Sequence, residues 1–194
     1  MTTRRMAVRR LLERAAAELK EPTWRVVGGQ RLQTKLSSQT SGIILALPAG
    51  YVIYDIKFAI GPRFPAIERV VAKARRVAGL PNDRTSSAFP TVFDSLSSFS
   101  ALPDYMSVER IGEIIAALRA NAIPFVHDIS TLDAAADYAL THPLAFGHHS
   151  MRIPVILAKA GRVREADEYF DRIIAQGPYS DSLQQYRKAV STLL

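Results

Sequence analysis

The chain has 194 residues, of which 48% are hydrophobic and 22% are charged. This composition is typical of a folded globular protein, and the length corresponds to one domain or to one domain with a small extension. The sequence contains no cysteine. This excludes disulfides, thiolate metal ligands and cysteine nucleophiles, and it fits a reducing compartment such as the cytoplasm.

The sequence predicts neither a membrane-spanning segment nor a secretory signal. Its least polar stretch, residues 42–54, is shorter than the roughly 18 apolar residues that a spanning helix needs, and Pro48 and Gly50 interrupt it. The first helix is rich in arginine, but Glu13 and Glu18 break the continuous apolar run that a secretory signal requires. We therefore expect a cytoplasmic protein that does not associate with membranes.

Positive charge is concentrated in the first half of the chain. Residues 1–84 contain 16 lysines and arginines against 6 acidic residues, whereas residues 85–194 contain 9 against 12. The net charge of the whole chain is +7. A basic half of this kind indicates an anionic partner, such as nucleic acid, phosphate or an acidic protein surface.

A first helix is predicted over residues 4–19, because Val8, Leu12, Ala15 and Leu19 recur at helical spacing. One side of this helix should therefore face the core. Acidic and basic residues four positions apart are expected to pair along its exposed side. The two pairs are Arg9 with Glu13 and Arg14 with Glu18.

Four strands are predicted next, where the hydrophobic period changes to two. They cover residues 24–27, 31–36, 42–47 and 51–60, with a glycine turn at Gly28-Gly29 between the first two. One side of the last strand should be buried. It carries Val52, Tyr54, Ile56, Phe58 and Ile60. We expect Gly61-Pro62 to end this strand, because proline cannot donate to the ladder. The pattern predicts an antiparallel meander with one buried face.

A second helix is predicted from Pro65 to about Ala78, with its apolar side packed on the sheet. That side carries Ile67, Val70, Val71, Ala74 and Val77. Residues 80–104 show no clean periodicity apart from a short strand expected over residues 91–96.

From about residue 107 the pattern is helical. A helix lined by isoleucines is expected to break around residues 121–124, and a second helix, capped by Thr131, should run to about residue 141. A helical hairpin over residues 151–176 and a last helix from residue 181 complete the chain. The predicted fold is α+β: an antiparallel β-meander covered by helices over residues 1–145, with a C-terminal helical hairpin over residues 146–194 packed on it.

The C-terminal hairpin resembles a tetratricopeptide unit. The residues that carry this resemblance are Leu157, Gly161, Ala166, Phe170 and Pro178, at spacings of nine and five before and four and twelve after the small residue at position 166. The sequence contains no second copy, and about three repeats are needed to build a repeat groove. We therefore expect a structural hairpin and no peptide-binding array.

The order of elements over residues 5–145 resembles a loosely defined group of small bacterial α+β domains. The features that carry the resemblance are the Trp24 and glycine-marked meander, the Thr131-Leu132-Asp133 cap and the His142-Pro143 pair. Some proteins of this appearance are immunity proteins, which neutralise a bacterial toxin by binding it. The resemblance implies a protein-binding function and transfers no functional residue.

Motifs of the common enzyme classes are absent from the sequence, including the nucleophile elbow, the phosphate loop, the dinucleotide-binding turn and the zinc-protease pair. Four histidines and three nearby aspartates could supply ligands or acid–base groups. They are His127, His142, His148, His149, Asp128, Asp133 and Asp137. Adjacent histidines on one element point in different directions, so we expect no metal, no cofactor and no catalytic residue.

The clearest candidate site is basic. Arg69, Lys73 and Arg76 lie at i, i+4 and i+7 on the polar side of the second predicted helix, and Arg75 is adjacent. The leading interpretation is a non-catalytic protein that binds a protein partner, with a toxin as one candidate. The alternatives are nucleic-acid binding through the basic N-terminal half and an unrecognised hydrolase that uses the histidine and aspartate region.

Overall fold

The structure is a computed structural model, and it describes residues 3–20, 23–49, 55–81, 90–92, 94–100, 108–143, 151–176 and 180–194. Contacts divide the chain into two compact units. The first contains Met1–Arg63 and Ala88–Ser130, and the second contains Phe64–Ser87 and Thr131–Leu194. Residues 64–87 and 131–145 thus group with the C-terminal helices, whereas the division expected from the sequence places them with the N-terminal part.

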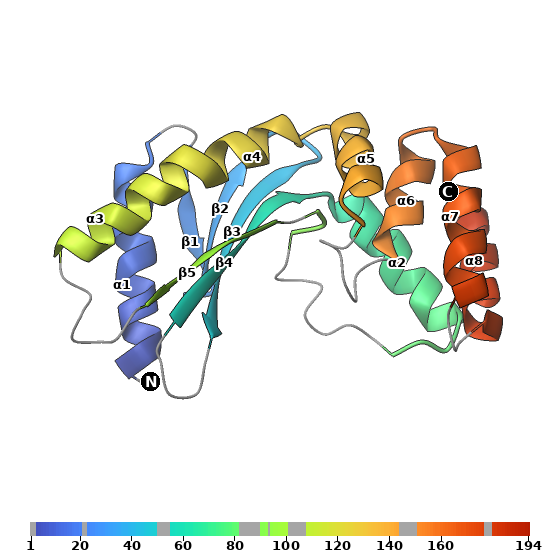
Figure 1. Ribbon diagram of the computed structural model, residues 1–194, viewed down its shortest axis with the longest axis horizontal. Helices are drawn as coiled ribbons and strands as arrows, with labels where there is room; N and C mark the ends of the chain where they lie inside the picture. Colours follow the sequence, from blue (N-terminus) through green and yellow to red (C-terminus); the bar gives the residue numbers. More distant parts are fainter. Residues whose placement is uncertain are drawn as a thin grey trace. The chain divides into compact units, whose positions relative to one another are not determined.

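The first unit is built on a five-stranded antiparallel sheet (Figure 1). The strands follow the chain order across the sheet, so the predicted meander is confirmed. They are β1 (Arg25–Val27), β2 (Arg31–Lys35), β3 (Ser41–Ala49), β4 (Asp55–Arg63) and β5 (Asp94–Ser100). Both glycines of the β1–β2 turn have positive φ, 63° at Gly28 and 72° at Gly29, as the glycine-turn interpretation requires.

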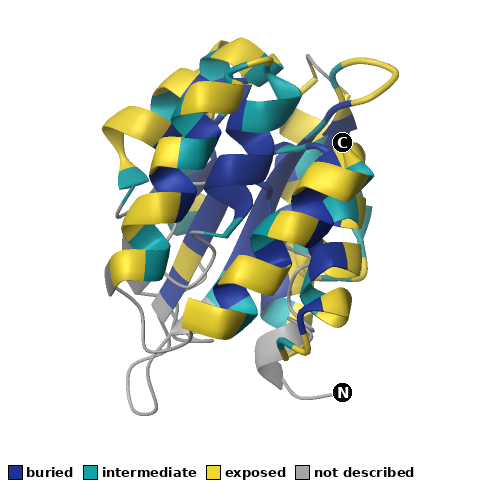
Figure 2. Ribbon diagram, turned by 90° about the vertical axis from the view of Figure 1, so that its right-hand side faces the viewer, coloured by how far each residue is buried: buried dark blue, intermediate teal, exposed yellow. Residues whose placement is uncertain are grey.

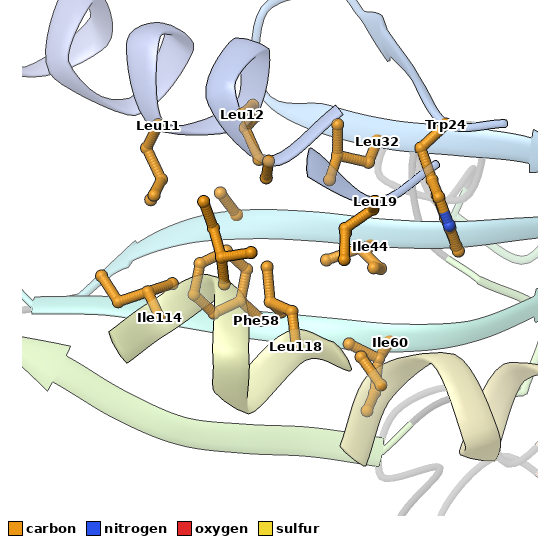
Figure 3. Close-up of a cluster of buried hydrophobic side chains, with 14 of the residues drawn as sticks. Leu11, Leu12, Leu19, Trp24, Leu32, Ile44, Phe58, Ile60, Ile114 and Leu118 are labelled. Carbon is orange, nitrogen blue, oxygen red and sulfur yellow. The ribbon is translucent and has the colours of Figure 1, made fainter. Parts of the chain in front are cut away.

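Helices cover one face of this sheet. They are α1 (Thr3–Glu18), α3 (Val108–Ala117), the π-helical turn η2 (Leu118–Ala122) and α4 (Ile123–Asp128). The residues predicted to face the core from α1 are buried, and the Arg9–Glu13 and Arg14–Glu18 pairs form on its other side at 2.7 and 2.8 Å. Side chains from α1, the strands, α3 and η2 meet in one apolar cluster that includes Leu12, Phe58 and Leu118 (Figure 3).

The opposite face of the sheet is also buried at its centre. Ile43, Leu45 and Ala59 are at most 4% exposed there, with Leu47 packed beside them. The expectation of a single buried face is therefore wrong. The outward positions of β3 are apolar as well as the inward ones, a pattern typical of strands covered on both faces.

Strand β4 continues through Gly61-Pro62, which the sequence analysis expected to end it. Gly61 pairs with Ile43 and Pro62 with Gly42. The carbonyl of Pro62 accepts a hydrogen bond from Thr91 N at 2.9 Å, on the side away from β3. A backbone N–H at position 62 would point to the same side. The β4–β5 ladder has already ended there, so proline removes no hydrogen bond from it. Proline is tolerated at such an edge position.

Two boundaries in the second part of this unit also differ from the predictions. The strand expected over residues 91–96 is β5, Asp94–Ser100, and Thr91 and Val92 form a bend before it. The helix expected to break around residues 121–124 continues instead through η2 into α4. Pro124 lacks a backbone donor, and the wider π-helical turn accommodates it while the side chain of Asn121 donates to Ala117 O at 3.0 Å.

The second unit is helical throughout its described residues. It contains α2 (Pro65–Val77), α5 (Leu132–Thr141), α6 (Arg152–Lys159), α7 (Val163–Gln176) and α8 (Ser180–Leu193). Helix α2 packs on α6 and α8, which corrects the expectation that its apolar side packs on the sheet. Helices α2, α5, α7 and α8 each bury one side and expose the other, which gives the alternation of dark blue and yellow in Figure 2. Helix α6 is buried at every position from Arg152 to Leu157.

The predicted C-terminal hairpin is present, and α6 packs on α7. Gly161 makes the turn with a φ of 79°. Leu157, Ala166 and Phe170 are all buried, as the hairpin interpretation requires. Pro178, the last position of the tetratricopeptide resemblance, lies outside the described residues. The α+β fold with a C-terminal helical hairpin is therefore confirmed, and the assignment to that repeat family stays a prediction.

Candidate partner-binding surface

The orientation of α2 is set by its buried side. Ile67, Val71 and Ala74 are at most 5% exposed and face α6 and α8. At 3.6 residues per turn, Arg69, Lys73 and Arg76 then fall on the opposite side of the helix. All three side chains are exposed, as the sequence predicts.

The three cations have no partner among the described residues. Among the residues that the structure describes, no hydrogen bond or ion pair engages Arg69, Lys73 or Arg76. Arg75 differs from them: its Nε and Nη2 donate to Pro81 O at 3.0 and 2.6 Å, just after the end of α2. Arg75 therefore helps to terminate the helix, and the basic group predicted from the sequence reduces to three residues.

Several arginines of the second unit are held in ion pairs. Arg187 of α8 contacts Asp167 and Asp171 of α7, each at 2.7 Å, and its guanidinium lies 5.9 Å from the centre of the Phe170 ring. Hydrogen bonding to Asp167 raises the pKa of Arg187. The cations on α2 differ in this respect from Arg187, which finds carboxylates on a neighbouring helix.

An apolar side chain lies at the edge of this basic stripe, next to Lys73. Val77 is 63% exposed, although the sequence analysis placed it in the apolar stripe of α2. Helical geometry explains the difference, because Val77 lies about 80° around the helix from Ile67 but only about 40° from Lys73. Ala66 and Ala72 are exposed on the same helix. We call Arg69, Lys73, Arg76 and Val77 the α2 surface.

A buried ion pair connects the inner side of α2 to α6. Glu68, adjacent to Arg69, is 8% exposed, and its Oε2 accepts from Nη2 of the 2% exposed Arg152 of α6 at 3.1 Å. Nearby, the Tyr186 hydroxyl donates to Met151 O at 3.0 Å, and burial raises the pKa of that hydroxyl well above its ordinary value. This pair was not predicted from the sequence, although a charged residue within an apolar helix stripe is a usable signal.

The histidine and aspartate region does not form a cluster within the described residues. His127 and His142 are exposed, and His142 stacks on Tyr138 with ring centres 4.4 Å apart. Asp137 is engaged by Arg162, whose Nη2 lies 2.6 Å from its Oδ1. No group of three potential metal ligands occurs among the described residues. His148 and His149 lie outside them.

Comparisons of the chain with protein-family models, with curated proteins and with solved structures find no match. The immunity-protein resemblance is therefore neither supported nor contradicted. Within the part of the chain that the structure describes, every helix is too short or too polar to cross a membrane. The α2 surface itself is therefore the feature of the chain that bears on its function.

Proposed function

We propose that this protein acts without catalysis by binding an acidic surface of a protein partner through the α2 surface. Neutralisation of a toxin, which the resemblance of the chain to immunity proteins implies, is one form that such binding takes. Acidic residues of the partner would pair with Arg69, Lys73 and Arg76.

The exposed Val77 carries this proposal. Protein interfaces combine apolar side chains with arginines and become dry at their centre. A valine that is 63% exposed next to Lys73 offers an apolar contact of this kind. A phosphate backbone gains little from contact with an isolated valine, because it is recognised mainly through charge.

The features of single-stranded nucleic-acid binding are weak on this helix. Such sites stack bases on aromatic rings interleaved with cations. Helix α2, Pro65–Val77, contains no aromatic residue. We therefore favour a protein partner over nucleic acid and make nucleic-acid binding an outcome of the test.

The test uses three variants of the full chain. The first replaces Arg69, Lys73 and Arg76 together with glutamine. The second is Val77→Ser. The third is a control that removes the same charge from exposed positions of α7 and α8, by changing Arg164, Arg172 and Lys188 to glutamine. Each is used as bait for quantitative capture from the source cells, and each is titrated with labelled DNA and RNA.

We expect a protein captured by the wild type and the control to be lost from both the triple α2 variant and Val77→Ser. A partner retained by all four baits, or no partner at all, would contradict the proposal. Nucleic-acid affinity that falls in the triple α2 variant but not in Val77→Ser would instead establish the nucleic-acid alternative.

A further inference from the structure

A second basic group lies in the first unit, on the sheet face opposite α1. The register places five cations on this face, in alternate positions of β1, β2 and β4. They are Arg25, Arg31, Lys35, Lys57 and Arg63. Asp55 of β4 shares this register. It pairs with Ala49, at the end of β4 opposite Arg63.

Two of these cations flank one small polar residue, and a third lies diagonally beside one of them. Ser41 pairs with Lys35 on one side and with Arg63 on the other, so the Cα atoms of the two cations are about 10 Å apart across β3. Arg25 pairs with Gln33, which places it diagonally next to Lys35. We call Arg25, Lys35, Ser41 and Arg63 the sheet corner.

The charge of Arg63 acts on a neighbouring cation of the same sheet face. Burial, and then the charge of Arg63, lower the pKa of Arg31. Like charges brought together on a sheet are destabilising. The stability of the rest of the fold has to offset this repulsion. An anion bound among the cations would reduce it.

Arg63 also holds a buried donor that the fold leaves unused. Its Nε is inaccessible and makes no hydrogen bond to any described residue. Lys35 and Arg25 are exposed, while Ser41 is half-buried, and none of the three side chains has a partner within the described residues. A buried guanidinium donor without an acceptor is uncommon in folded proteins.

We propose that the sheet corner is a binding site for a phosphate group carried by a small ligand, such as a phosphomonoester or a diphosphate. The guanidinium of Arg63 would donate to the phosphate oxygens, Arg25 and Lys35 would balance the charge, and the Ser41 hydroxyl would donate a further hydrogen bond. This site does not depend on the function proposed for α2.

The charge of the corner favours phosphate over carboxylate. One arginine fork satisfies a carboxylate, whereas a phosphate group offers more charge and more acceptor oxygens. The three cations of the sheet corner match this higher charge. The corner covers one or two phosphate groups, because its cations span only the β1–β4 width at one end of the sheet. It therefore fits a small ligand better than a nucleic-acid strand.

The test is a titration of the isotopically labelled full chain with pyrophosphate at constant ionic strength, followed by nuclear magnetic resonance. We expect saturable shifts of the Arg63 Nε–H signal and of the backbone amides of Lys35 and Ser41. Arg63→Gln should weaken binding by tenfold or more. Lys57→Gln removes the same charge from the same face of β4, about 20 Å away along the strand, and should change the affinity less than twofold.

Shifts that do not saturate, or equal weakening by Arg63→Gln and Lys57→Gln, would overturn the proposal. If Arg63→Gln does not fold, Lys35→Gln replaces it, because that side chain is exposed and contributes little to packing. A single-stranded oligonucleotide is titrated in parallel. Binding tenfold tighter than pyrophosphate at the same signals would assign the corner to nucleic acid and would refute the small-ligand assignment.

Discussion

Removal of one partner of the buried Arg152–Glu68 pair should destabilise the second unit strongly. Arg152 is the largest fully buried side chain of the chain's described core, and its Nη2 contacts Glu68 at 3.1 Å. The change Arg152→Met keeps an unbranched side chain of related length in the same space but removes the charge. It leaves the carboxylate of Glu68 buried without this cation.

Breaking a buried ion pair from one side typically costs about 3–5 kcal/mol, because the remaining charge stays out of water. This is a large share of the roughly 5–15 kcal/mol that separates a folded domain from its unfolded state. For a urea dependence of about 2 kcal/mol per molar, the midpoint of unfolding should fall by about 1.5–2.5 M. Replacing both partners, as in Arg152→Met with Glu68→Leu, should cost about 2 kcal/mol less than Arg152→Met alone, since no buried charge then remains.

Urea unfolding followed by far-ultraviolet circular dichroism measures these free energies. Trp24, the only tryptophan, lies in the first unit, so its fluorescence reports separately on that unit. We expect the circular dichroism of Arg152→Met to change at a lower urea concentration than that of the wild type. A midpoint within about 0.3 M of the wild type, or a double variant less stable than Arg152→Met, would refute the reasoning, given the usual slope of the urea dependence.

Two further substitutions test the packing of single positions. Gly42→Ala would place a Cβ 2.7 Å from Val126 Cγ1 and 3.1 Å from Trp24 Cη2, so we expect a loss of about 1–3 kcal/mol in urea unfolding followed by Trp24 fluorescence. Adding Val126→Ala removes the Cγ1 atom that the new Cβ meets. If the double variant recovers none of the lost stability, the clash with Val126 is not the cause of the loss. Thr131→Ala removes the oxygen that accepts from Ala134 N at 3.2 Å and should cost about 1 kcal/mol by circular dichroism. Thr131→Ser should retain most of the wild-type stability, and equal losses in the two variants would contradict a capping role.

Local periodicity was sufficient to predict most elements of the fold. The alternation of Ile56, Phe58 and Ile60 predicts the buried face of β4, and all three residues are buried. The helix cap at Thr131 is likewise local, because its side chain bonds a backbone N–H only three residues away. The structure shows this hydrogen bond. In both cases the sequence pattern and the packing favour the same conformation, so a rule based on neighbouring residues succeeds.

The predictions at the two prolines were wrong because they depended on partners distant in sequence. Pro62 can stay in β4 because its carbonyl meets Thr91 and its missing donor faces no strand. Pro124 can stay in a continuous helix because the π-helical turn before it absorbs the missing hydrogen bond. Proline excludes a backbone donor, and whether that ends an element depends on whether the fold places an acceptor there.

One of the two candidate sites could be predicted from the sequence alone, and the other could not. The α2 surface lies on one helix, so spacing alone brought Arg69, Lys73 and Arg76 together, and the structure added only Val77 and removed Arg75. The sheet corner is assembled from three strands, and its residues become neighbours only through the pairing of Ser41 with both Lys35 and Arg63. A shift of one residue in that register would turn one of these cations toward the apolar cluster and dissolve the corner. Charge alone predicted an anionic partner for the first half of the chain, whereas the register is what gives that charge a location.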